Sequence, residues 1–215
     1  MSNWRTPMLS TPLYILDLIG VAVFATTGAL VASRKQMDII GFVLLATLTG
    51  VGGGTFRDLI LGRTVFWTID QTYLITCFAI AIIAFFASHL IQRRYIALLW
   101  LDAIGLSAYG VMGAHIATQN GAGFFVAGAM GVMTATFGGM IRDVVSDENV
   151  LILQEEIYAT AALVAAFAYL GLTYLGIPPL YAASAGTALG LVARGGAIIW
   201  HWQLPRYKPR EGREY

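Results

Sequence analysis

Charged residues are scarce in this sequence. They make up 12% of the 215 residues, whereas hydrophobic residues make up 58%, and a soluble domain carries about 25% charged residues. The mean hydropathy is +0.71. This shortage of charge excludes an ordinary soluble domain and indicates an integral membrane protein in a lipid bilayer. The net charge is only +1 and no long basic run is present, so we expect neither a nucleic acid nor a soluble protein as partner.

Cysteine and histidine are also sparse. Cys77 is the single cysteine, which excludes a disulfide within the chain and a cysteine-based metal site. The three histidines, His89, His115 and His201, are far apart in the sequence, so we expect no cofactor and no metal beyond permeating monovalent cations. The sequence also lacks GxSxG, HExxH and P-loop motifs. We therefore predict that the protein is not an enzyme.

Hydrophobic residues instead form long runs, separated by short polar or Gly- and Pro-containing segments. A helix that crosses a membrane needs about 20 mostly apolar residues. The runs predict an all-α integral membrane protein with seven transmembrane helices in a single domain, residues 1–215. The predicted spans are Pro12–Ala32, Ile39–Leu61, Thr72–Ile91, Ile96–Thr118, Gly123–Val145, Ile157–Gly176 and Leu180–Trp202.

Lysine and arginine are distributed unevenly between the two sides that these spans define. One side carries eight of them, near residues 34–35 and 93–94 and in the tail 203–215, and the other carries two, Arg5 and Arg63. Positive residues are enriched in the cytoplasmic loops of membrane proteins. We therefore expect an external N-terminus and a cytoplasmic basic tail.

The sequence also repeats itself. The segment LDLIGVAVFATTGA at residues 16–29 recurs as LDAIGLSAYGVMGA at residues 101–114, a separation of 85 positions that continues without a gap for some 40 further residues. Each repeat holds three predicted spans, so the second repeat enters the membrane from the opposite side. The alternative is that the duplication only makes a stable bundle. The predicted divisions are 12–91 for repeat 1, 96–176 for repeat 2 and 180–202 for the seventh helix.

Consecutive glycines occur at equivalent places in both repeats. Gly52, Gly53 and Gly54 lie within the second span, and Gly138 and Gly139 lie within the fifth. Each glycine costs a helix interior about 1 kcal/mol relative to alanine, so we expect both helices to kink or unwind there. Unwound backbone in a membrane must face protein or a water-filled path, and its carbonyl groups can contact a cation. The predicted ion pathway therefore includes these glycines with Thr55, Asp58 and Asp143. The alternative is close packing of helices through small residues.

An Arg-Asp pair follows the glycines in each repeat. Neighbouring residues point about 100° apart on a helix, so we expect each member to find a partner elsewhere or to contact water. Matching depths in the membrane predict two ion pairs, which leave Asp58 and Asp143 free to line a vestibule and attract cations. The alternative is that the charged groups extend to the membrane surface as anchors. The predicted pairs are Asp17–Arg57 and Asp102–Arg142.

The seven spans, the inverted three-plus-three repeat and the motifs GGGTFRD and FGGMIRD resemble the prokaryotic branch of the trimeric intracellular cation channel family. Bacterial members of this group are also labelled as glycine-transporter domains. The resemblance covers residues 13–202. It implies a homotrimer in the inner (plasma) membrane of a prokaryote, with a pore for K⁺ and Na⁺ between the two repeats of each protomer. It also implies that the helices kinked at Gly52–Gly54 and Gly138–Gly139 shape the pore. Phosphoinositide regulation is not implied, because the Lys-Glu-Val motif of the animal members is absent.

We therefore predict a passive, weakly selective channel for monovalent cations. Phe24 and Tyr109, which occupy matched positions in the repeats, are candidates for a gate. The alternative is a secondary transporter of a small solute such as glycine, because inverted repeats with interrupted helices also suit alternating access. A third class is a membrane scaffold whose trimer is itself the product.

Overall fold

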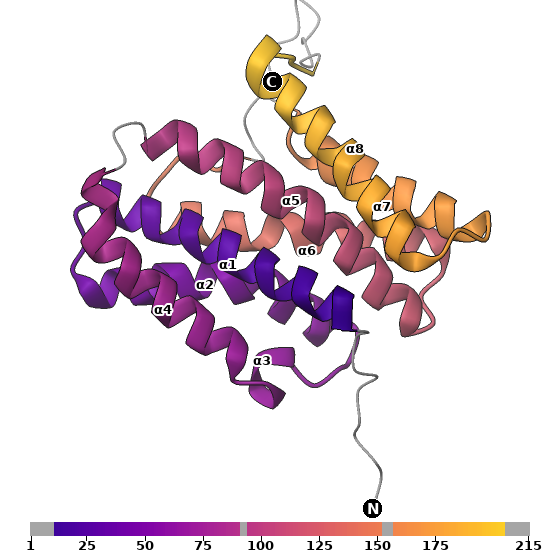
Figure 1. Ribbon diagram of the computed structural model, residues 1–215, viewed down its shortest axis with the longest axis horizontal. Helices are drawn as coiled ribbons and strands as arrows, with labels where there is room; N and C mark the ends of the chain where they lie inside the picture. Colours follow the sequence, from indigo (N-terminus) through magenta and orange to yellow (C-terminus); the bar gives the residue numbers. More distant parts are fainter. Residues whose placement is uncertain (1–10, 91–93, 152–156, 205–215) are drawn as a thin grey trace, which may run out of the picture.

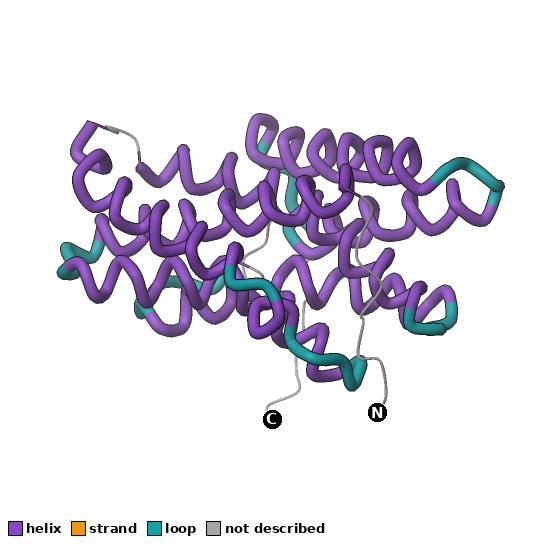
Figure 2. The backbone as a smooth tube through the Cα atoms, turned by 60° about the horizontal axis from the view of Figure 1, so that its bottom comes forward, coloured by secondary structure: helices purple, strands orange, loops and turns teal. Residues whose placement is uncertain are grey.

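The described part of the chain is almost entirely helical. The computed structural model describes residues 11–90, 94–151 and 157–204, and short connections join its helices (Figure 2). The elements are α1 (Thr11–Arg34), α2 (Ile39–Ile60), α3 (Phe66–Ile69), α4 (Thr72–Ala87), the 3₁₀ turn η1 (Ser88–Leu90), α5 (Arg94–Gln119), α6 (Phe124–Val145), α7 (Ala159–Tyr174) and α8 (Pro179–Trp200).

Six of these helices are long and apolar enough to cross a membrane. They are α1, α2, α4 extended by η1, α5, α6 and α8, and they correspond to six of the seven expected spans. The remaining expected span is α7, which has 16 residues and is about 24 Å long at 1.5 Å per residue, less than the hydrocarbon thickness of about 30 Å. The expected end at Ile91 and most of the tail 203–215 lie outside the described residues.

The helices α2 and α6 end in the same way. Gly62 has a φ of 63° and Asp147 a φ of 51°, the left-handed conformation that commonly follows the last turn of a helix. The next amide reverses onto the helix, with Arg63 N–H donating to the Asp58 carbonyl at 2.8 Å and Glu148 N–H donating to the Asp143 carbonyl at 2.9 Å. The chain therefore leaves each helix beside the equivalent aspartate, Asp58 in α2 and Asp143 in α6. This exit positions the following loop over the Arg-Asp pair.

The helices form two equivalent groups of three. The helices α1, α2 and α4 contact one another, as do α5, α6 and α7, while α1 packs on α5 and α2 packs on α6. The last helix, α8, packs against α5 and α7 and lies on the outside of the second group (Figure 1). This arrangement places the charged ends of α2 and α6 inside the bundle.

Contacts between the two groups are reciprocal. Gly20 on α1 faces the ring of Tyr109 on α5, and Gly105, at the equivalent position of α5, faces the ring of Phe24 on α1. The two rings also pack edge to face, with centroids 5.4 Å apart. Residue numbers therefore rise along α1 as they fall along α5, so the two helices run antiparallel, as Figure 1 also shows. The two candidate gate residues thus meet at the boundary between the groups.

Candidate functional site

The consecutive glycines lie where α2 crosses α6. A Cβ added to Gly53 would overlap the carbonyl oxygen of Thr134, and one added to Gly138 would lie 2.5 Å from the carbonyl oxygen of Thr49. These four residues are equivalent in pairs, so this contact is also reciprocal. Glycine permits the two backbones to approach within a distance that any side chain would prevent.

The same helices are continuous through the glycines. Helix α2 runs without interruption from Ile39 to Ile60 and α6 from Phe124 to Val145, so the unwound backbone expected at Gly52–Gly54 and at Gly138–Gly139 is absent from this conformation. The physical reason is that close packing of the helices offsets the low helix propensity of glycine. A bend at these positions stays a prediction.

Gly54, Gly139 and Thr55 contact residues of their own groups, whereas Gly52 faces Ile141 of α6. Gly54 faces the Phe66 ring of α3, and a Cβ on Gly139 would lie 2.9 Å from the Tyr158 hydroxyl. Thr55 donates its hydroxyl to the Val51 carbonyl at 2.7 Å and accepts a hydrogen bond from the indole of Trp67 at 2.9 Å. Thr55 therefore holds α3 against α2 in this conformation.

The short helix α3 was not expected from the sequence, because only four residues adopt it within a polar connection. It is fixed on its far side through Asp70, which accepts hydrogen bonds from the Tyr14 hydroxyl at 2.7 Å and from the Thr72 amide at 2.9 Å. Partial burial acts to raise the pKa of the Asp70 carboxyl, but these hydrogen bonds from Thr72 and Tyr14 outweigh it and hold the pKa below its ordinary value of 3.8.

The first charge cluster comprises Asp17, Arg57, Asp58 and Tyr73. Arg57 Nε lies 2.9 Å from Asp58 Oδ1, and the other oxygen of Asp58 accepts the Phe66 amide at 2.9 Å. Asp17 Oδ2 accepts the Tyr73 hydroxyl at 2.8 Å. All three charged side chains are at most 3% exposed.

The second charge cluster comprises the equivalent residues Asp102, Arg142, Asp143 and Tyr158. Arg142 Nε lies 2.8 Å from Asp143 Oδ1, and its Nη1 lies 2.7 Å from Asp102 Oδ1. The second oxygen of Asp143 accepts the Leu151 amide at 3.1 Å, which repeats the contact between Asp58 and Phe66. Each cluster thus places one guanidinium with two carboxylates, and the hydrogen bonds limit the cost of burying these charges.

The clusters confirm one expected ion pair and contradict the other. The Asp102–Arg142 pair is present, whereas Asp17 and Arg57, both within the described residues, form no pair within 4.0 Å. Each arginine also bonds the aspartate that follows it, which was not expected, while both aspartates and Arg142 find further partners elsewhere, as expected. A long arginine side chain curls around the helix and spans the 100° between neighbouring Cβ directions. Asp58 and Asp143 are consequently not left without partners.

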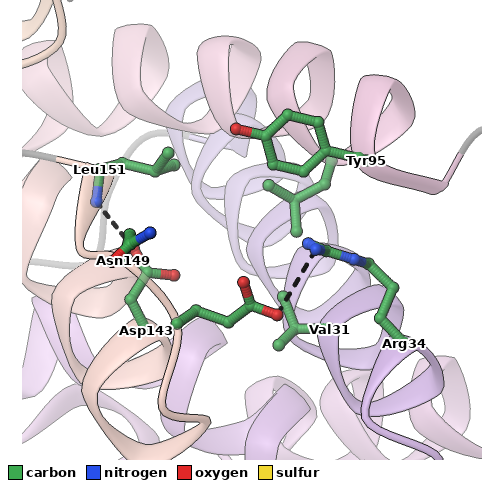
Figure 3. A pocket seen from close by; sticks show the side chains of 8 residues that line it. Val31, Arg34, Tyr95, Asp143, Asn149 and Leu151 are labelled. Atoms are coloured by element: carbon green, nitrogen blue, oxygen red, sulfur yellow. Dashed lines mark hydrogen bonds and ion pairs between the residues drawn. The ribbon is translucent and has the colours of Figure 1, made fainter. Parts of the chain in front are cut away.

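A cavity opens beside the second cluster. Its volume is about 220 Å³, and Asp143 is one of the residues that line it (Figure 3). Arg34 packs over Tyr95, with Cζ 5.0 Å from the ring centroid, and bridges to Glu148 at 3.5 Å. The cavity is thus lined by the carboxylates of Asp143 and Glu148 and by the guanidinium of Arg34. Its full lining is Val31, Arg34, Tyr95, Leu98, Asp143, Glu148, Asn149 and Leu151.

Three residues at the site were not singled out from the sequence. Tyr73 and Tyr158, which occupy equivalent positions 85 residues apart, lie beside the aspartates of their clusters. Thr27 accepts a hydrogen bond from Arg142 Nη1 at 3.0 Å, and no sequence signal pointed to it because Met112 stands at the equivalent position. Within residues 11–90, 94–151 and 157–204, no group of three or more His, Cys, Asp or Glu residues could hold a metal ion.

Fold and site together define a multi-pass α-helical membrane protein built from two equivalent three-helix groups. A family model described as "Glycine transporter" matches the chain twice, at residues 14–89 and 99–174, and the two matches begin 85 positions apart. Together with similar solved structures, this match shows that the chain belongs to the prokaryotic branch of the trimeric intracellular cation channel (TRIC) family.

Individual relatives agree with this assignment over nearly the whole chain. The "UPF0126 inner membrane protein YadS" of Escherichia coli (strain K12) is 38% identical over 200 residues, which cover 90% of this chain and 95% of the relative. A structure described as the "TRIC trimeric intracellular cation channel orthologue from Rhodobacter sphaeroides" has a TM-score of 0.88 and 51% identity, covering 90% of this chain and all of the other. The structure of "a prokaryotic TRIC channel in 0.5 M KCl" has a TM-score of 0.85 and 29% identity, with 91% and 100% covered. The chain is thus a multi-pass protein of a bacterial inner membrane.

Proposed function

We propose that the protein is a passive channel for the monovalent cations K⁺ and Na⁺. The observation that carries this proposal is the similarity, at 51% identity over 90% of the chain, to the Rhodobacter sphaeroides structure described as a trimeric intracellular cation channel orthologue. By the same similarity we propose that three copies of the chain assemble and that each copy has its own pore.

The charge clusters support cations rather than anions as the permeating species. Each cluster contains two carboxylates and one guanidinium, so its formal charge is negative when both acids are ionised. Acidic groups along a pore favour cations. The sequence does not resemble the carbonyl-rich loops of K⁺-selective filters, and we therefore expect weak discrimination between K⁺ and Na⁺.

The pore is proposed to pass between the two three-helix groups, with seven spans in all and the second group inverted. In this topology the N-terminus is external, the C-terminus is cytoplasmic, and the cavity beside Asp143 opens towards the cytoplasm. The conformation described here is closed on this proposal, because the charged side chains of both clusters are at most 4% exposed. Gly52–Gly54 and Gly138–Gly139 are proposed as the positions where α2 and α6 bend on opening, and Phe24 with Tyr109 as a constriction at the boundary.

Purified protein in a planar bilayer under a KCl gradient tests this function. We expect discrete unitary currents that reverse near the K⁺ equilibrium potential, and only a modest shift in reversal potential when Na⁺ replaces K⁺ on one side. A reversal near the Cl⁻ potential, or no unitary current from folded protein, would contradict a cation channel.

A second candidate is a secondary transporter of glycine, and the description of the matched family model favours it. The equivalent three-helix groups are compatible with alternating access. This candidate predicts saturable glycine uptake into vesicles together with electrical silence in the bilayer, so the same preparation separates the two functions.

A further inference from the structure

The two charge clusters differ in the hydrogen bonds that they form across the boundary between the repeats. Arg142 on α6 donates from Nη1 to Asp102 on α5 and also to Thr27 on α1, at 2.7 and 3.0 Å. Thr27 belongs to the first repeat, and Arg142 and Asp102 belong to the second. This bond between Thr27 and Arg142, called the inter-repeat bond below, joins a buried cation to the opposite repeat.

The first cluster lacks an equivalent bond for a reason that is visible in the sequence. The residue equivalent to Thr27 is Met112, whose thioether is at most a weak acceptor. Among the described residues Arg57 Nη1 has no hydrogen-bond partner, and its guanidinium carbon instead lies 5.7 Å from the Phe66 ring centroid. The bond that crosses the boundary there runs from the Tyr109 hydroxyl to the Asp17 carbonyl, and at 3.4 Å it is long.

The inter-repeat bond is completely shielded from water. Thr27 and Arg142 are 0% exposed and Asp102 is 1% exposed, and the Thr27 hydroxyl donates to the Phe24 carbonyl at 2.8 Å, which orients its lone pairs towards the guanidinium. Helix α1 also packs against α6, whereas the equivalent approach of α5 to α2 is weaker. The boundary is therefore held more firmly at the second cluster than at the first.

The position of Arg142 makes it an obstacle to a cation. Asp143 lines the cavity of Figure 3, and its carboxylate is bonded to Arg142 Nε at 2.8 Å. A cation that moves from this cavity along the boundary meets a buried guanidinium, and the repulsion between like charges is strong where water is absent. Passage therefore requires Arg142 to shift, and the bond to Thr27 opposes a shift away from α1.

We propose that Thr27 is a positioning residue that holds Arg142 across the repeat boundary and thereby stabilises the closed state at the cavity side. This inference rests on the proposed channel function. It assigns the two ends of the protomer different roles. The end at the second cluster is held by a charged hydrogen bond, and the end at the first cluster is not.

The test uses Thr27→Val, which keeps the shape of the side chain and removes its hydroxyl. A hydrogen bond to a charged group contributes about one power of ten to an equilibrium constant, so we expect the open-to-closed ratio in planar bilayers to rise about tenfold at unchanged unitary conductance. Thr27→Ser restores the hydroxyl and should behave as wild type. The matched control is Thr26→Val, because the neighbouring Thr26 only donates to the Ala22 carbonyl of its own helix; it should leave gating unchanged.

Two results in the bilayer would overturn the proposal. One is an unchanged open-to-closed ratio in Thr27→Val, and the other is a changed unitary conductance, which would make Thr27 part of the pore lining instead. Thr27→Ala, which also lacks the hydroxyl, provides the same comparison if valine prevents folding.

Hydrogen exchange separates this proposal from the channel function itself. In Thr27→Val, amides at residues 139–145 of α6 should exchange about tenfold faster than in wild type, and those of Thr26→Val should not. If wild type passes no current but this acceleration is seen, the inter-repeat bond stands and the channel function fails. If exchange is unaltered, the inter-repeat bond is refuted whatever the currents show.

Discussion

The contact between α2 and α6 allows a sharp test of why the glycines are there. In Gly138→Ala the new methyl carbon would lie 2.5 Å from the Thr49 carbonyl oxygen, whereas ordinary contact begins at 3.4 Å. The obstacle is backbone, which cannot rotate away, so the helices must separate by about 1 Å. A gap of that size forfeits a quarter to a half of the dispersion energy of the atoms involved.

The expected loss of stability follows from these opposing terms. Overpacking of this kind costs about 1–3 kcal/mol, and the better helix propensity of alanine returns at most about 1 kcal/mol. We expect a net loss of about 1–2 kcal/mol, or a fall in Tm of about 2–8 °C for a chain of this size. Thermal unfolding in detergent, followed by circular dichroism, measures it.

Gly171→Ala is the matched control. Gly171 lies within α7, and a Cβ added there meets nothing within 4 Å. The same change should therefore be neutral or slightly stabilising at this position. If Gly138→Ala proves as stable as Gly171→Ala, close backbone approach is not the reason for the glycine. The pair of variants thus isolates the contact from helix propensity.

Other measurements probe the charge clusters and the loop beyond α3. Asp102→Asn removes one partner of a buried ion pair and should lower the free energy of unfolding by about 3–5 kcal/mol. Asp17→Asn should lower it clearly less, because Asp17 has no ion pair within 4.0 Å among the described residues. Equal losses of the two variants in chemical unfolding would contradict this assignment. Tyr14→Phe removes a hydrogen bond to Asp70 and should move the pKa of that carboxyl upward towards 3.8. A carboxyl whose pKa is lowered by folding adds to the free energy of unfolding at pH values above its unfolded pKa, and this contribution is lost as the pH falls through its folded pKa. The Tm difference between wild type and Tyr14→Phe should therefore shrink between about pH 5 and 3, and a difference that stays constant would refute this reasoning.

Much of the fold is available from the sequence because a bilayer imposes simple requirements. Helices must satisfy all backbone hydrogen bonds internally, so the apolar runs locate α1, α2, α4, α5, α6 and α8 to within a few residues of the bounds found. Matched depth together with the repeat of 85 positions also predicts the Asp102–Arg142 pair, whereas the contact between Phe24 and Tyr109 was not predicted. Connections carry no such constraint, and α3 was missed because its four residues are too few to give a periodic pattern.

The two errors at the site have different physical origins. Reasoning from Cβ directions assigns partners by the face of a helix, but arginine reaches far beyond its Cβ. This reach is why Arg57 bonds Asp58 and Arg142 bonds Asp143, the aspartate that follows each arginine. The glycines of α2 do not unwind the helix, because whether a glycine breaks a helix or admits a neighbour depends on the partner helix, which local sequence does not specify.

Internal symmetry predicts what the two repeats share, and it conceals what makes them differ. Applied strictly, it would give Arg57 and Arg142 the same partners, yet among the described residues Arg142 has three residues as oxygen partners and Arg57 has one. Two substitutions between the repeats lie beside these arginines, since Thr27 corresponds to Met112 and Leu151 corresponds to Phe66. The hydroxyl offers Arg142 an extra acceptor, while the aromatic ring gives the guanidinium of Arg57 a face to lie against. Positions where a duplicated membrane protein departs from its own repeat are therefore the places to look for what makes its two ends behave differently.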